Sequence, residues 1–201
     1  MNLGSVYFSI RNYDKAMACY RQYLSICEQQ EDKKGIGVAQ GSMGMVYQAK
    51  GDHAQALEHY SRAIDTAKDL RVPADSCVFM LKKANLLFTM NKFEHAGSVN
   101  DEALQTATQL GFENAIFQSS LLRAKLAAVA DKQGAIHQLN DMLPNFPKSA
   151  MQAEIFYQLF TLTHTAGHRN RAAALYRALY DQYRNAAYKE RLQELDRQTA
   201  R

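Results

Sequence analysis

The chain has 201 residues, of which 47% are hydrophobic and 22% are charged. This apolar content is enough to bury a continuous core, so the composition excludes a disordered chain. The 24 basic and 20 acidic residues give a formal charge of +4. Because the two signs alternate along the sequence without forming a basic block, we expect no nucleic-acid partner.

No apolar run approaches the roughly 20 residues that a membrane-spanning helix needs, and the N-terminus lacks the apolar region of a signal peptide. We therefore expect no membrane partner and a cytoplasmic location. The three cysteines, Cys19, Cys27 and Cys77, are odd in number and have no Cys-x-x-Cys spacing. They predict neither a disulfide framework nor a zinc site.

A repeat of about 40 residues runs through the sequence. One small residue recurs in a predicted first helix, at Gly4, Gly44, Ala84 and Ala124. A second small residue recurs in a predicted second helix, at Ala16, Ala56, Ala96 and Ala172, and in several copies a tyrosine follows it by one helical turn. Small residues on both helices allow their backbones to cross closely, and the aromatic ring fills the space beside the crossing.

In chain order, the predicted helix pairs occupy residues 1–30, 33–70, 73–110, 113–146 and 148–183. The register holds for three copies, loosens in the fourth and returns in the fifth at a spacing of about 36. Residues 1–183 are therefore expected to form one repeat array. In the remaining segment, 184–201, Tyr188, Leu192 and Leu195 lie on one helical face. This segment is expected to be a capping helix or the start of a linker helix that leads to another domain.

Turn signals separate the two helices of each pair. In the second pair Gly51 can adopt the left-handed conformation that ends a helix, and Asp52 is a good N-cap. Asn91-Lys92 and Gly167-His168 occupy the corresponding places, whereas the first pair has Arg11-Asn12 and should have a more strained turn. Pro73 and Pro147 fall between pairs, where proline suits the first turn of a new helix.

The residues of the first two copies resemble the tetratricopeptide repeat family. The resemblance rests on Gly4, Tyr7, Ala16, Tyr20 and Leu24, and on the same pattern at Gly44, Tyr47, Gly51, Ala56, Tyr60 and Ala63. The 40-residue unit is similar to the longer repeats of kinesin light chains, spindle-orientation adaptors and bacterial regulators. The resemblance implies an all-α fold, a right-handed α-solenoid of about five antiparallel helix pairs with a C-terminal capping helix.

In such a solenoid the first helices line the inner surface, which is the expected binding surface for a protein or peptide. Counting from the small residue of each first helix predicts the residues that line this groove. They are Phe8, Met45, Gln48, Leu81, Asn85, Phe88, Lys125, Tyr157, Thr161 and His164. Lys82 joins them because it stands at a position that binds ligand in chaperone-binding members of the family. Met45, Phe88 and Tyr157 are expected to act as anchors, while Gln48 and Asn85 bond the backbone of the ligand. The alternative is an ordinary inner surface that binds nothing in particular.

Chaperone-binding members of the family grip a C-terminal carboxylate with basic and asparagine residues on successive first helices. The corresponding positions here are Met1, Ser5, Ser42, Gly41, Met45 and Lys82. A single lysine is not enough for this clamp, so we expect no tight binding of an acidic chaperone tail.

The sequence shows no motif that predicts catalysis, metal binding or a cofactor. His164 and His168 are spaced i, i+4, but Gly167 is expected to interrupt the helix between them, and no third ligand is nearby. We therefore expect an adaptor or scaffold domain and not an enzyme. The alternative is a sensor domain from a larger bacterial signalling protein with a cyclase, kinase or DNA-binding output. A helical hydrolase is the least favoured interpretation, since the acidic residues fall at turns and outer faces.

Overall fold

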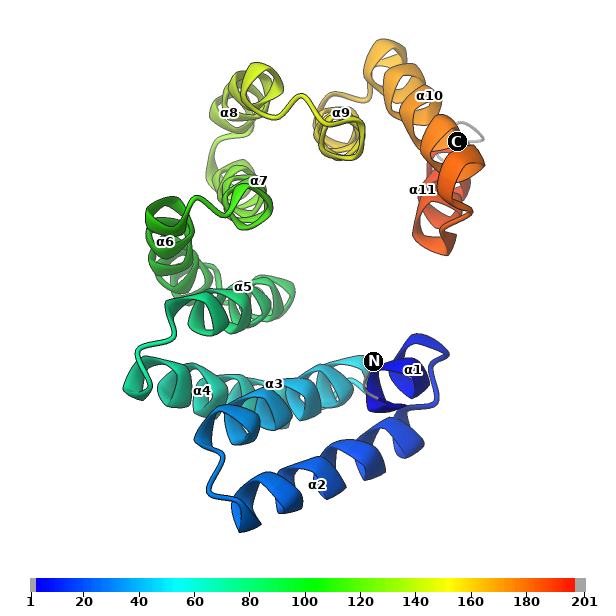
Figure 1. Cartoon of the computed structure of the whole chain (residues 1–201). Coiled ribbons are helices and arrows are strands. Elements are labelled where there is room, and N and C mark those ends of the chain that lie inside the picture. Colours follow the sequence, from blue (N-terminus) through cyan, green and yellow to red (C-terminus); the bar gives the residue numbers. More distant parts are fainter. Residues whose placement is uncertain (1–2, 198–201) are drawn as a thin grey trace. The chain divides into compact units, whose positions relative to one another are not determined.

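A computed structural model describes residues 3–197, and throughout this part of the chain the structure is all-α (Figure 1). The described residues form helices and connecting turns and contain no strand, which confirms the predicted fold class. The helices are α1 (Leu3–Ser9), α2 (Tyr13–Gln29), α3 (Lys33–Ala49), α4 (His53–Asp69), α5 (Pro73–Thr89), α6 (Phe93–Leu110), α7 (Glu113–Ala130), α8 (Lys132–Asn145), α9 (Ser149–Thr163), α10 (Ala166–Tyr183) and α11 (Ala186–Arg197).

The chain divides into two compact units, Met1–Ser119 and Ser120–Arg201, and the division falls inside α7. In the first unit α1 packs on α2, α3 on α4 and α5 on α6, while α2 contacts α3, and α5 contacts both α3 and α4. In the second unit α8 contacts α9, α9 contacts α10 and α10 contacts α11. The extent of the array, 1–183, and its unit limits stay a prediction.

Left-handed residues end successive helices at a constant interval. In the first unit they are Arg11, Glu31, Gly51, Arg71, Asn91 and Gly111, each 20 residues after the last. Only two of the six are glycine, so four of these turns hold a side chain in a conformation that disfavours it. Arg11, with φ of 59°, confirms the expectation that the first turn is strained.

Side chains that follow these turns fix where the next helix starts. Asn12, Asp32 and Asp52 each accept a hydrogen bond from a backbone N–H in the first turn of α2, α3 and α4. This satisfies one of the N–H groups that a helix start leaves without a partner. Pro73 occupies the first turn of α5, as its place between pairs predicts.

The turn between α9 and α10 differs from the prediction. Gly167 lies inside the first turn of α10, and the left-handed residue that ends α9 is His164, with φ of 54°. A helix end does separate His164 from His168, as predicted. It lies at His164, three residues before the glycine that was expected to form it. Thr165 is the N-cap residue of α10, and no side chain caps that helix.

Gly51, which is left-handed, and Gly167, which is helical, provide a matched test of how backbone conformation at the turns affects stability. Gly51→Ala is expected to lower the free energy of unfolding by about 1 kcal/mol, because alanine must adopt the left-handed conformation that Gly51 holds at φ of 83°. Nothing lies within 4 Å of the added methyl group at either Gly51 or Gly167. Gly167→Ala, in a helical turn, should instead stabilise by about 0.5 kcal/mol. Urea unfolding that gives both substitutions the same sign would contradict this.

The predicted small residues do lie at the crossings of the helices. Ala16, Ala56, Ala96 and Ala172 are fully buried. A methyl group on Gly44 would come within 2.8 Å of the Tyr60 ring, and one on Gly4 within 2.6 Å of the Tyr20 ring. Glycine therefore faces each tyrosine because no side chain fits there. In the third pair Asn100 stands in place of the tyrosine and Ala84 in place of the glycine, and Asn100 donates a hydrogen bond of 3.0 Å to the backbone oxygen of Ser119.

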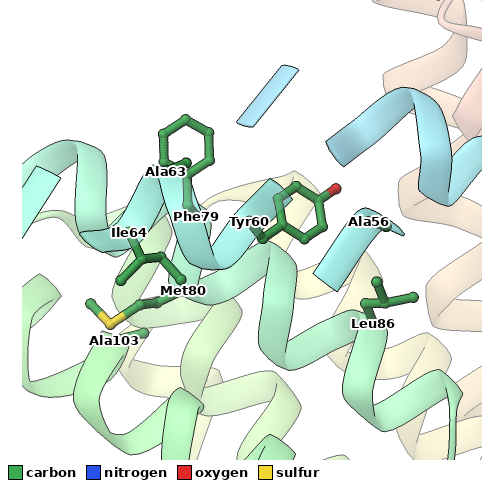
Figure 2. Close-up of a cluster of buried hydrophobic side chains, with 8 residues drawn as sticks. All are labelled: Ala56, Tyr60, Ala63, Ile64, Phe79, Met80, Leu86 and Ala103. Carbon is green, nitrogen blue, oxygen red and sulfur yellow. The ribbon is translucent and has the colours of Figure 1, made fainter. Parts of the chain in front are cut away.

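The core of the first unit joins the second and third pairs. Figure 2 shows Tyr60 and Ile64 of α4 among Phe79, Met80 and Leu86 of α5. Each of these five side chains is 9% exposed or less. Because the cluster links α4 to α5, it fixes the position of α5 beside the second pair.

Candidate functional site

The first helices of the first unit carry a face that the second helices leave uncovered. On α5 it consists of Val78, Lys82, Asn85 and Thr89, which are spaced i, i+4, i+7 and i+11 and therefore lie in one row. The residues 40 positions earlier, Val38, Ser42, Met45 and Ala49, form the same row on α3. We call these eight residues the open stripe. All are half-buried or exposed, whereas the rows on either side contain buried residues.

Some predicted groove residues lie on the open stripe. Met45, Lys82 and Asn85 are on it, although the half-buried Met45 also packs against the core cluster, as Leu81 does. The Asn85 side chain is exposed and donates a hydrogen bond of 2.8 Å to the backbone oxygen of Leu81. Its carboxamide oxygen can accept a hydrogen bond from a ligand.

Other predicted groove residues pack between helices. Leu81 is half-buried against the core cluster. Gln48 accepts a hydrogen bond of 2.7 Å from the Tyr60 hydroxyl. Phe88 lies 5.6 Å, between ring centroids, from Phe93 at the start of α6.

Phe8 of α1 repeats the arrangement of Phe88, with its ring 5.7 Å from Tyr13 at the start of α2. Both phenylalanines are half-buried beside the turn that joins the two helices of a pair. They hold that turn in place and offer only part of their rings to a ligand. A role for Phe8 and Phe88 in binding stays a prediction.

Counting from the small residue missed Val38, Ser42 and Val78. Val78 is 46% exposed, which is unusual for a valine in the middle of a helix. The signal that could have found this row is Gly41. A methyl group on Gly41 would overlap the ring of Phe79, so a glycine at this position marks a packed contact with α5 and not an open surface.

Lys82 has an unusual environment on the open stripe. It is half-buried and makes no ion pair or hydrogen bond with any described residue. Burial lowers the pKa of its ammonium group, because removing a charge from water disfavours the charged form. Its neighbour Lys83, in contrast, donates a hydrogen bond of 2.9 Å to Ser61 of α4.

In the second unit Tyr157 of α9 is covered by α11. The Arg191 guanidinium lies 4.2 Å above the Tyr157 ring, and the Tyr157 hydroxyl donates a hydrogen bond of 2.9 Å to Glu194. Only 8% of Tyr157 is exposed. Burial, followed by the contact with Glu194, raises the pKa of this phenol. Tyr157 can anchor a ligand only if α11 moves.

Glu154 joins three elements in the same region. It accepts hydrogen bonds from the Tyr176 hydroxyl at 2.7 Å, from Gln158 at 2.8 Å and from Arg191 at 3.3 Å. These partners lie on α10, α9 and α11, so a single carboxylate ties the three helices together. A network of this kind fixes the orientation of helices and does not leave the carboxylate free for a ligand.

The three remaining predicted residues of the second unit are more accessible. Lys125 of α7 is half-buried, and burial lowers the pKa of its ammonium group while Glu154 raises it. Thr161 donates its hydroxyl to the backbone of Gln158. His164 is exposed at the end of α9, and its ring lies roughly perpendicular to that of Phe160, with the ring centroids 6.1 Å apart. Their roles in binding stay predictions.

A buried histidine in the first unit was not predicted as a special residue. His59 of α4 is 7% exposed, and its ring stacks on Tyr47 at 5.0 Å between ring centroids. Its Nδ1 donates a hydrogen bond of 2.6 Å to Gln40, since the carboxamide oxygen can only accept. Burial, and then the nearby Arg62, lower the pKa of the imidazole.

This pKa predicts a pH dependence of stability. Above the ordinary histidine pKa of about 6.5 the ring is neutral in both folded and unfolded chains, and its contribution to stability is complete. As the pH falls below that value the unfolded chain takes up a proton first, so the free energy of unfolding decreases. Chemical denaturation from pH 7.5 to 5 should show this decrease in the wild type and a smaller one in His59→Gln. Equal slopes would refute it.

The described residues contain no group of three or more histidine, cysteine, aspartate or glutamate side chains that could hold a metal ion. His168 is instead bonded through Nδ1 to the hydroxyls of Thr163 and Thr165. No helix among residues 3–197 is both long and apolar enough to cross a membrane. Met1, one of the positions compared with the carboxylate clamp, and residues 198–201 at the C-terminal end lie outside the described residues.

Comparison with known protein families gives a match for the N-terminal third of the chain. The family model described as tetratricopeptide repeat matches residues 1–69. These residues include the first two helix pairs, on which the sequence resemblance is strongest. No curated protein matches the chain.

Solved structures with the same fold extend over nearly the whole chain. The Rap conjugation gene regulator of plasmid pLS20, in complex with the Phr* peptide, has a TM-score of 0.69 at 18% identity. The alignment covers 92% of this chain but 53% of that one, so this chain spans about half the length of the Rap regulator. TPR-like repeats assigned to a kinesin light chain of Podosopora anserina have a TM-score of 0.60 at 14% identity, covering 99% of this chain and 94% of theirs.

YrrB, a TPR protein with an unusual peptide-binding site, has a TM-score of 0.51 at 16% identity. The alignment covers 96% of this chain and 89% of YrrB. At these identities the three structures establish a shared fold and leave the ligand of this chain open.

Proposed function

Because this chain is built of tetratricopeptide repeats, we propose that it is an adaptor that binds an extended segment of another protein along the open stripe. The proposal is of a binding protein and not of an enzyme. The observation that carries it is the row of accessible side chains repeated at the same places on α3 and α5. Two solved neighbours, the Rap regulator and YrrB, are described with a peptide or a peptide-binding site, which supports the same class of partner.

The composition of the open stripe suits an extended chain. Val78 and Met45 offer apolar contacts, while Asn85 and Ser42 offer polar groups to a peptide backbone. The α3 and α5 rows repeat every 40 residues, so a segment lying across both helices meets similar positions in succession. Repetition of this kind lets one partner make many weak contacts.

Affinity capture with the full chain tests the proposal. The test variant is Ser42→Glu plus Asn85→Glu, which places one charge on each helix of the open stripe and leaves Phe88 and Met45 in their packed positions. The control is Gln22→Glu plus Gln105→Glu, which adds the same charge at exposed positions of α2 and α6. We expect partners recovered by the wild type and the control to be lost from the test variant. Equal recovery by both double variants would refute the proposal.

A second candidate is a regulatory sensor domain within a larger protein. The observation that favours it is the Rap regulator, a gene regulator about half of whose length this chain matches. Under this alternative the open stripe would bind a signalling peptide, and the resulting conformational change would be transmitted to an output domain. The reading frame around the coding sequence distinguishes the two candidates, because only the sensor requires a fused output domain.

A further inference from the structure

The first helices of the first unit carry a half-buried cation, Lys82, that the described residues leave without a partner. Lys82 lies in the middle of the α5 row of the open stripe, with Val78 one turn before it and Asn85 one turn after it. The side chain is half-buried, yet none of the described residues donates to it, accepts from it or forms an ion pair with it. An ammonium group removed from water without a partner lowers the stability of a protein.

The surrounding first helices contain almost no negative charge. Neither α1 nor α3 has an aspartate or glutamate. The acidic residue of α5 is Asp75, two turns before Lys82, and its carboxylate lies 4.0 Å from Lys34. The chain therefore places a partly dehydrated positive charge on a surface of apolar and amide groups, and the acid of α5, Asp75, is paired with Lys34 instead.

From this charge we infer that the partner segment carries an aspartate or glutamate side chain that pairs with Lys82, flanked by apolar residues that contact Val78 and Met45. The inference rests on the proposed function and specifies the chemistry of the ligand at the same surface. A pair formed at a half-buried position is screened less by water than one on an open surface, so it contributes more to affinity.

The acid is a side chain and not the free C-terminus of the partner. The open stripe continues past Lys82 in both directions, toward Val78 and toward Asn85 and Thr89. A segment that ended at Lys82 would leave half of the α5 row uncovered. A second cation, which would be needed to hold both carboxylates of an acidic chain end, is missing from the open stripe.

The experiment selects 12-residue peptides from a random displayed library on the full chain and measures their binding as synthetic peptides by fluorescence anisotropy. The synthetic peptides have amidated C-termini, which removes the terminal carboxylate as a source of charge. We expect the retained peptides to share an acid between apolar residues. Replacing that acid by glutamine should weaken binding by about tenfold, the usual effect of one charge-assisted hydrogen bond.

Two lysine variants complete the test. Lys82→Met should weaken binding of the acidic peptide by about tenfold and leave the glutamine peptide unaffected, so that the two changes do not add. Lys83→Met removes the same charge from the adjacent residue, whose ammonium group bonds Ser61, and should leave binding unchanged. Thermal unfolding of Lys82→Met in the absence of peptide should occur at a higher temperature than in the wild type, which shows that the variant folds.

The outcomes separate this inference from the proposed function. Retained peptides without an acid, or equal binding by the wild type and Lys82→Met, would overturn the inference and leave peptide binding intact. Binding that requires a free C-terminal carboxylate would also overturn it. A library that yields no bound peptide would overturn the proposed function, and the inference with it.

Discussion

Tyr60→Ala should lower the free energy of unfolding by about 3–5 kcal/mol, the range measured for removing a large buried ring. Tyr60 is 1% exposed and packs in the cluster that joins α4 to α5, as Figure 2 shows. Its removal leaves a cavity that the facing residue, Gly44, has no side chain to fill. Urea unfolding monitored by circular dichroism measures the loss.

Tyr60→Phe is the matched control for this substitution. It keeps the ring and removes the hydroxyl that donates to Gln48, so the expected loss is about 0.5–1.5 kcal/mol. A loss for Tyr60→Ala no larger than that for Tyr60→Phe would show that the ring does not support the joint between the second and third pairs.

Glu154→Ala should destabilise the second unit by about 2–4 kcal/mol. The substitution removes the acceptor of the Tyr176 hydroxyl and one ion-pair partner of Arg191. Tyr176 is 2% exposed, so water cannot easily replace the lost hydrogen bond. Hydrogen exchange followed by mass spectrometry should show faster exchange in α9, α10 and α11.

Glu194→Ala is the control for the second unit. The Glu194 side chain is 42% exposed, so water can solvate the groups it leaves, and the expected loss is about 1 kcal/mol or less. Equal destabilisation by the two substitutions would mean that Glu154 has no special role in tying the three helices together.

The helix pairs could be predicted from the sequence because close packing of two helices requires small residues at regular intervals. Alanine at positions 16, 56, 96 and 172 recurs where two backbones cross, and the structure buries all four completely. The glycines that face Tyr20 and Tyr60 follow from the same requirement for space. The ends of the helices were harder to predict from the sequence. Glu31 and Arg71 adopt the left-handed conformation at two of these ends, where glycine or asparagine is usual.

The open stripe could be predicted only in part from the sequence. Counting from Gly44 assumed that the face opposite the packed side is open, but a first helix packs against three neighbours and not one. Gly41 faces α5 and Gln48 faces α4. Only the narrow row from Val38 to Ala49 remains accessible, and within it Met45 is partly packed against the core cluster. Tyr157 could not be placed from the sequence because its environment depends on α11, which is 37 residues away at Glu194.

The sequence could not predict that Lys82 has no acidic partner among the described residues. Position within the repeat placed Lys82 and not Lys83 at the groove, but it did not predict which of the two adjacent lysines would have a partner within the chain. The structure directs Lys83 to Ser61 and leaves Lys82 on the open stripe. Their different surroundings follow from the 100° that separates neighbouring residues on a helix.

Site-specific photo-crosslinking tests most directly whether the open stripe binds the partner. A benzoylphenylalanine at position 85 would stand on the open stripe, and one at position 105 would stand on the exposed side of α6. If an extended segment lies across α3 and α5, irradiation in the presence of a bound partner gives a covalent product from position 85 and none from position 105. Crosslinks from position 105 alone would contradict the proposed function.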